Sequence, residues 1–369
     1  MYPKTLLSRQ YRNNGDRLTT LTDKQSLAWS RYFKDLESGV LHRQILSNCP
    51  QCRSDEPTII AEKDRYGDNV ITAVCKGCGL VYTLNQFDAE STHKFYRDYY
   101  RDLYTKSSSI AAAFENMKRS ANNSQKDCEK FLNYLGLTPK ADLIVELGCG
   151  GGWNLLPFQA CGFNVIGFDY NEDLLACGRQ EGLNLKNLNH VNASDVIDKA
   201  SLIIIQEVLE HTLDPFELLS EINGHLRLGG YVFITVPPLE EIPYGYASGR
   251  LLGILQNAHN FLFDRATMRA YLEQAGFDVV FLRHDLRALA KKTRIPSRNP
   301  AKIPGNYERN MSILTLSENW LQWYWRSIGK GLSLAGRDKA EYKAITRWHK
   351  RYFSPARRRE IVSAFETGY

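Results

Sequence analysis

Four cysteines near the N-terminus have the spacing of a metal site. They form two C-x2-C pairs separated by 22 intervening residues: Cys49, Cys52, Cys75 and Cys78. Two residues between paired cysteines allow a tight turn to present both thiolates to one ion, and four thiolates complete the tetrahedral coordination of Zn²⁺. The spacing therefore predicts a structural zinc ribbon, which would stabilise about 35 residues whose own core is too small. A redox pair and two disulfides are the competing interpretations.

A glycine-rich turn is the second motif that could do chemistry. It follows the short apolar run 142–147 and has an acid at its start: Glu146-Leu147-Gly148-Cys149-Gly150-Gly151-Gly152. Glycines allow the backbone to turn tightly and to approach a ligand without a Cβ in the way. Ligands of open α/β sheets bind at the carboxyl ends of the strands, which is where this turn is expected.

The details of this turn exclude two common nucleotide sites. The third glycine of a dinucleotide fingerprint would fall on Trp153, and no G-K-[ST] triplet of a P-loop follows. Because Glu146 would repel a pyrophosphate, the turn suits a cationic ligand better. An amino group or a sulfonium fits this description.

A second acid lies where the second expected strand ends. Asp169 follows Gly148 by 21 residues, a position from which a carboxylate can accept hydrogen bonds from both ribose hydroxyls. Tyr170 could pack on an adenine ring, and Asp195, after the third expected strand, could reach the edge of the adenine.

The elements that must position these residues alternate between strand and helix. Strands are expected over 142–147, 163–169, 188–193, 201–206, 231–236 and 277–282, and a last one over 310–316. Asp214 and Pro215 predict the start of a helix between the fourth and fifth strands. Such alternation indicates a mostly parallel sheet with helices on both faces.

Residues from about 129 to 316 resemble a class I S-adenosylmethionine-dependent methyltransferase. The likeness rests on the glycine turn, on Asp169, and on two segments, Gln206-Glu207-Val208-Leu209-Glu210-His211 and Leu228-Gly229-Gly230. It implies that the turn holds the methionine part of the cofactor, that Asp169 holds the ribose and that Gln206 lines the cofactor cleft. A Rossmann-type turn that binds another nucleotide, or nothing, is the alternative.

The chain is expected to divide into five parts. They are an N-terminal helical segment (1–47), the zinc ribbon (48–84), a helical connector (85–128), the methyltransferase domain (129–316, with a basic insertion at about 283–309) and a basic, tryptophan-rich helical extension (317–369). A ribbon and a tyrosine-rich connector before this core resemble bacterial methyltransferases that act on sugars or glycans in polysaccharide synthesis. One group of ribosomal-RNA methyltransferases also places a ribbon before the core.

Methyl transfer to a hydroxyl or a carbon acid requires a general base. His259 is the first candidate, since it follows the fifth strand in a region where substrate-facing loops belong. His211, just beyond the fourth strand, is the second. Tyr244 and Tyr246 are expected to line the acceptor pocket. Each histidine could instead serve only to cap or to shape the pocket.

Charge is distributed unevenly along the chain. Residues 281–369 contain 19 Lys and Arg against 7 Asp and Glu, whereas the whole chain has a net charge of +6. The excess suggests an anionic partner such as a phosphorylated substrate, RNA or a membrane surface, or else a solvated surface without a partner. Trp320, Trp323 and Tyr324 would share a helical face there, suited to core packing or to peripheral membrane contact.

These features favour a methyltransferase for a sugar nucleotide or glycan, with S-adenosylmethionine as cofactor and structural Zn²⁺. An RNA methyltransferase and a non-catalytic module that binds the cofactor are the alternatives. No apolar run is long enough to span a membrane, and the first residues do not resemble a secretory signal, so a cytoplasmic location is expected, with contact at the inner membrane surface as an option.

Overall fold

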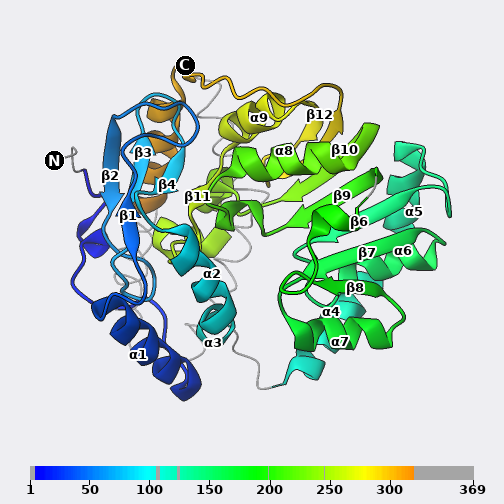
Figure 1. Cartoon of the computed structure of the whole chain (residues 1–369). Helices are drawn as coiled ribbons and strands as arrows, with labels where there is room; N and C mark the ends of the chain where they lie inside the picture. The colour runs from blue at the N-terminus through cyan, green and yellow to red at the C-terminus, as the bar shows by residue number, and fades with distance from the viewer. Residues whose placement is uncertain (1–4, 105–108, 123–124, 198, 245, 320–369) are drawn as a thin grey trace, which may run out of the picture.

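A seven-stranded mixed sheet forms the largest part of the computed structural model, which describes residues 5–104, 109–122, 125–197, 199–244 and 246–319 (Figure 1). The strand order is β12-β13-β10-β9-β6-β7-β8. From β8 to β10 all neighbours are parallel, whereas β13 is antiparallel to both β10 and β12. The strands are β6 Leu143–Leu147, β7 Asn164–Asp169, β8 Asn184–Asn187, β9 Ala200–Gln206, β10 Leu226–Thr235, β12 Phe277–Leu282 and β13 Arg287–Lys292.

Both faces of this sheet are buried, as the apolar strand sequences require. On β9, Ile203 and Ile205 belong to one apolar cluster, and Leu202 and Ile204 belong to another. The helices of this region are α4 Ile110–Asn122, α5 Gln125–Leu135, α6 Leu156–Ala160, α7 Glu172–Gln180, α8 Pro215–His225 and α9 Arg265–Gln274. The predicted α/β fold, Rossmann-like with helices on both faces, is therefore confirmed (Figure 1).

The predicted helix start at Asp214 is also confirmed, since its carboxylate accepts from the backbone N–H groups of Phe216 and Glu217 at 3.0 and 3.3 Å. Pro215 occupies the first helical position, where a missing N–H costs nothing. The helix ends at His225, and the strand that follows contains Gly229 and Gly230.

Two predicted strands were wrong. The third strand is 184–187, just before the predicted 188–193, and the last strand is 287–292 instead of 310–316. The strand 287–292 lies inside the expected basic loop and forms because Ala288, Leu289 and Ala290 are buried between β10 and β12. Residues 306–319 are helical instead, and two asparagines four residues apart, Asn306 and Asn310, both donate to Asp264.

The ribbon region forms a second sheet with the order β11-β4-β3-β2. Its strands are β2 Pro57–Ala61, β3 Thr72–Cys75 and β4 Val81–Thr83, together with β11 Phe261–Leu262 from the middle of the methyltransferase region. Because β11 pairs with β4, the ribbon and the larger domain share a hydrogen-bonded sheet. The expected boundaries between domains stay predictions.

The N-terminal segment and the first part of the connector pack together beside the ribbon. Helices α1 Asp23–Glu37, α2 Ala89–Asp98 and α3 Tyr100–Tyr104 surround an aromatic cluster that includes Trp29, Tyr32 and Phe95. Strands β1 Arg43–Ile45 and β5 Asn85–Phe87 pair next to them. Figure 1 shows α2 and α3 between the ribbon and the large sheet.

The expected tryptophan-rich extension lies almost wholly outside the described residues, which end at position 319. Its predicted helical character and its surface role therefore stay predictions. Among the described helices, none combines the length and the apolar character that crossing a membrane requires.

Candidate functional site

The glycine turn lies at the carboxyl ends of β6 and β7. Gly148, Gly150 and Gly152 have φ values of +73°, +55° and +74°, a region that side chains with a Cβ rarely adopt. A Cβ on Gly148 would lie 2.5 Å from Val208 Cγ2. The turn therefore needs glycine both for its backbone conformation and for its closeness to the segment after β9.

Asp169, at the end of β7, connects this turn to the strand through a hydrogen bond. One carboxylate oxygen accepts from the N–H of Gly150 and the other accepts from the N–H of Asn171, both at 2.8 Å. Burial raises the pKa of Asp169. Each oxygen keeps a lone pair, so the carboxylate can still accept from a diol.

Glu146 is the buried acid at the start of the turn. One of its oxygens accepts from Asn154 Nδ2 at 2.8 Å, while the other is buried and has no hydrogen-bond partner. Burial raises the pKa of Glu146 to about 8. An orphaned buried carboxyl oxygen is costly, and a cationic ligand group would remove that cost.

The other expected cofactor residues lie at or beyond the carboxyl ends of β9, β7 and β8. Gln206 ends β9 beside it, and Tyr170 is half exposed after β7, with its ring at 6.5 Å from that of His93. Asp195 ends a short 3-10 turn and is exposed. Their roles in binding a cofactor stay predictions.

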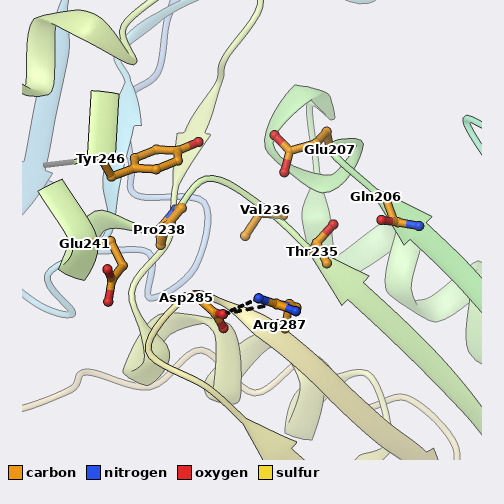
Figure 2. Close-up of a pocket in the computed structure, with 9 residues that line it drawn as sticks. All are labelled: Gln206, Glu207, Thr235, Val236, Pro238, Glu241, Tyr246, Asp285 and Arg287. Carbon is orange, nitrogen blue, oxygen red and sulfur yellow. Dashed lines mark hydrogen bonds and ion pairs between the residues drawn. The ribbon is translucent and has the colours of Figure 1, made fainter. Parts of the chain in front are cut away.

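A cavity of about 420 Å³ continues from Gln206 along the ends of β9 and β10 (Figure 2). Of the two tyrosines expected here, Tyr246 lines the cavity, and Tyr244 is not among the residues that do. Figure 2 shows the Tyr246 ring and the Glu207 carboxylate on the same side of the cavity. The described lining residues are Gln206, Glu207, Thr235, Val236, Pro238, Glu241, Tyr246, Asp285 and Arg287.

A cluster of ionisable side chains lies next to Glu207, which interacts with Glu210. Glu210, His211 and His259 each have a ligand atom within 4.8 Å of the other two. Both oxygens of Glu210 are buried without a hydrogen-bond partner. Carboxylate and imidazole groups at such separations influence each other's protonation, and they have the ligand types of a divalent-cation site as well.

Burial makes the uncharged forms of this cluster the favoured ones. It raises the pKa of Glu207, and burial together with the neighbouring Glu207 charge raises that of Glu210 further. Burial lowers the pKa of His211 to about 4 and that of His259 well below its ordinary value. Buried acids and bases with shifted pKa values are typical of catalytic sites.

The two histidines make different hydrogen bonds. His211 Nδ1 lies 2.9 Å from the backbone oxygen of Ala258 and therefore donates to it. The Nε2 lone pair of neutral His211 then remains free, at 3.7 Å from a Glu210 oxygen. His259 lies against His211, with ring centroids 4.9 Å apart, and its Nε2 contacts the side-chain nitrogen of Gln256.

Several residues of the site were not predicted from the sequence. Tyr96 and Tyr100, from the connector, place their rings 6.0 and 5.8 Å from that of His211. Tyr96 lies in α2 and Tyr100 begins α3, so the break between these helices prevents a prediction from the spacing along one helix. Arg65, in the loop between β2 and β3, donates to the side chain of Gln256, and no sequence signal links that pair.

The four predicted zinc ligands converge in the ribbon. All are buried and none forms a disulfide. Cys49 Sγ lies 3.6 Å from Cys78 Sγ, and Cys52 Sγ lies 3.4 Å from Cys75 Sγ. Four sulfurs at about 2.3 Å from a tetrahedral ion would be roughly 3.8 Å apart, so the cluster is close to the required size.

The backbone around the cysteines also suits thiolates. The N–H of Gly77 donates to Cys75 Sγ at 3.3 Å, and a Cβ on Gly77 would lie 2.9 Å from Cys52 Sγ. The donor set and its size therefore fit Zn²⁺, and a zinc ion remains an inference from this fit.

Comparison with known proteins identifies the larger domain. Residues 120–282 match the model of a family described as Methyltransferase domain. Over 172 residues the chain is 26% identical to the ubiquinone biosynthesis O-methyltransferase of Hydrogenovibrio crunogenus, a match covering 42% of this chain and 70% of that protein. The enzyme of the same name from Aeromonas salmonicida is 31% identical over 99 residues, which are 25% of this chain and 42% of that protein.

Solved structures align with part of the chain at low similarity. An S-adenosylmethionine-dependent methyltransferase from Clostridium acetobutylicum aligns with a TM-score of 0.38 and 11% identity, covering 50% of this chain and 98% of that one. The family match and the sequence relatives confirm that residues 120–282 are a methyltransferase domain and that its enzyme class is S-adenosylmethionine-dependent methyltransferase.

The fit of the cysteine cluster predicts the metal content of the protein. We expect Cys78→Ser to lose a zinc ion that the wild type binds at about one per chain, and to melt at a lower temperature, because the ribbon has little core without metal. Elemental analysis and thermal unfolding measure both quantities. Cys177→Ser, a change outside the ribbon, is the control and should do neither. Undiminished zinc in Cys78→Ser would place the ion elsewhere, for example at Glu210.

The raised pKa of Glu146 predicts a pH dependence of cofactor binding. Below about pH 8 the buried carboxyl is protonated, and a cationic cofactor group favours its ionised form, so binding releases a proton. Affinity for S-adenosylhomocysteine should therefore rise with pH, by up to about tenfold per pH unit, and level off above about pH 8. Isothermal titration calorimetry across this range measures the slope.

Two variants separate Glu146 from the rest of the site. Glu146→Gln should bind more weakly at high pH and lose the slope. Asp169→Asn should bind more weakly and keep a pH slope that levels off at a lower pH, because the Asp169 charge helps to raise the pKa of Glu146. A wild-type affinity that does not change with pH would contradict the role given to Glu146.

Proposed function

We propose that this S-adenosylmethionine-dependent methyltransferase methylates a hydroxyl or a carbon of a sugar nucleotide or glycan. The observation that supports this most directly is the lining of the cavity beside Gln206. Six of the nine lining residues named above are polar or charged, and a tyrosine ring is among the rest. Such a surface suits a ring with several hydroxyls, because each hydroxyl needs a hydrogen-bond partner once it is buried.

The cofactor would occupy the turn at the ends of β6 and β7. In this arrangement the glycine turn and Glu146 hold the methionine part, and Asp169 accepts from the ribose hydroxyls. Tyr170 and Asp195 contact the adenine. Gln206 belongs to both sites, since it ends β9 next to the turn and also lines the cavity. The methyl group would thus be presented at the cavity.

Methyl transfer from a sulfonium requires alignment more than charge stabilisation. S-adenosylmethionine bound in the turn would supply an electrophilic methyl group, and the residues of the cavity would hold the acceptor and receive its proton. The acceptor's proton goes to a base. We assign this proton to the cluster of Glu207, Glu210 and His211, because Glu207 lines the cavity and the Nε2 lone pair of His211 is free.

The relatives give partial support for an oxygen acceptor. Their names describe O-methyltransferases of ubiquinone biosynthesis. The rim residue Arg287, whose guanidinium is bound to Asp285 at 2.8 Å, could reach an anionic group on the acceptor. A phosphorylated acceptor is consistent with this position. The expected contacts of the C-terminal extension with RNA or a membrane concern residues outside the described part of the chain.

Transfer of label from S-adenosylmethionine into a host extract tests the proposal. With a radiolabelled methyl group, we expect label in a small anionic or lipid-extractable fraction that survives RNase. His211→Asn should reduce that labelling by at least about a hundredfold, the range expected for loss of a general base, while keeping its affinity for S-adenosylhomocysteine.

The matched control is His225→Asn, a histidine that ends α8 just before the amino end of β10, whereas the cavity lies at the carboxyl end of that strand. It should label as the wild type does. Label that disappears with RNase would instead make the protein an RNA methyltransferase. Cofactor binding without any labelled product in any fraction would indicate a non-catalytic module.

A further inference from the structure

The segment 253–262, which contains His259, is held by the ribbon. Arg65 donates its backbone N–H to the oxygen of Leu255 at 3.0 Å, and the N–H of Asn257 donates to the Asp64 carboxylate at 3.1 Å. Further along, the hydroxyl of Thr83 donates to the backbone oxygen of His259 at 2.9 Å. A loop of the methyltransferase region is thus positioned by residues that precede it by almost two hundred positions.

A chain of contacts between side chains runs from Arg65 in the ribbon to the imidazole of His259. The Arg65 guanidinium donates to Gly253 O at 3.0 Å and to Gln256 Oε1. Gln256 Nε2 then contacts His259 Nε2. Gln256 is buried, with 6% of its surface exposed, so water is not available to replace either contact.

This chain of contacts determines which way the amide of Gln256 points. A guanidinium has only donors, so the group that faces Arg65 must be the amide oxygen. The NH₂ of Gln256 therefore faces His259 and donates to it. Nε2 of His259 must be the acceptor, which places the proton of the neutral ring on Nδ1.

We propose that Arg65 is a positioning residue that, through Gln256, holds His259 in the Nδ1–H tautomer, so that His259 acts as a hydrogen-bond donor in the active site and not as its base. The proposal rests on the proposed function only in assigning this cluster to methyl transfer. Arg65 belongs to the ribbon, so the ribbon would help to position an active-site side chain in addition to folding around its metal.

The two neighbouring histidines then have complementary roles. His211 donates from Nδ1 to the backbone and keeps a free lone pair on Nε2, whereas the Nε2 lone pair of His259 is occupied by Gln256. His259 Nδ1 is buried, next to the backbone of Ile254 and near the Glu210 carboxyl. Its N–H can therefore donate to either of these protein groups. His259, expected from the sequence to be the base, becomes the donor beside it.

Nitrogen-15 NMR of the full-length protein labelled in its histidine rings tests this directly, without any methyl acceptor. Protonated and unprotonated ring nitrogens have well-separated chemical shifts, and His259→Asn identifies the His259 signals by their loss. In the wild type we expect a protonated Nδ1 and an unprotonated Nε2. In Arg65→Met the amide is free to rotate, so the two His259 shifts should move toward each other as the tautomers mix.

A second variant keeps the proposal testable if Arg65→Met does not fold. In Gln256→Glu, a carboxylate can only accept, so His259 Nε2 should become protonated and its shift should move to the protonated range. Arg53→Met, which changes an exposed arginine of the ribbon, is the control and should leave both shifts unchanged. A wild type with protonated Nε2, or unchanged shifts in both Arg65→Met and Gln256→Glu, would overturn the proposal. These results do not depend on the identity of the acceptor.

Discussion

The backbone of residues 253–262 is hydrogen-bonded on two sides, and the arrangement of the site depends on this. Asn260 shows the constraint most clearly. Its N–H donates to the oxygen of Glu210 at 2.8 Å, its side chain donates to the oxygen of His211 at 3.2 Å, and its own oxygen accepts from the N–H of Thr83 at 2.8 Å. Because these groups are buried, losing either side would leave unpaired polar atoms, so the ribbon and the segment after β9 are fixed relative to each other.

The chemistry of the site follows from burial of groups that are usually charged. One carboxyl oxygen of Glu146 and both of Glu210 have no hydrogen-bond partner, and burial shifts the pKa values of both residues upward. In the same way burial keeps His211 uncharged near neutral pH. Such groups can bind a ligand favourably, because a cationic cofactor group or an acceptor hydroxyl supplies the hydrogen-bond partners that the protein itself does not.

Local patterns in the sequence were sufficient for the parts of the structure that depend on near neighbours. The C-x2-C pairs, the glycine turn and the apolar strands such as Ser201–Gln206 were all recognisable. Pairings between distant residues were not. β13 was missed because Arg287–Lys292 has only three apolar residues in a basic stretch, and β11 has two residues whose pairing with β4 has no periodic signal. The Arg65–Gln256 contact joins positions 191 apart, and it becomes visible only when the ribbon is folded against the larger domain.

Hydrogen–deuterium exchange, followed by peptide mass spectrometry after zinc removal with a chelator, tests the central claim that the ribbon holds the active-site loop. If the ribbon holds this loop, amides of 253–262 should lose protection against exchange together with those of β3 and β4. The amides of β6 and β9, at the centre of the large sheet, should stay protected. Loss of protection in the ribbon alone, with 253–262 unchanged, would contradict it and would mean that the methyltransferase domain positions this loop by itself.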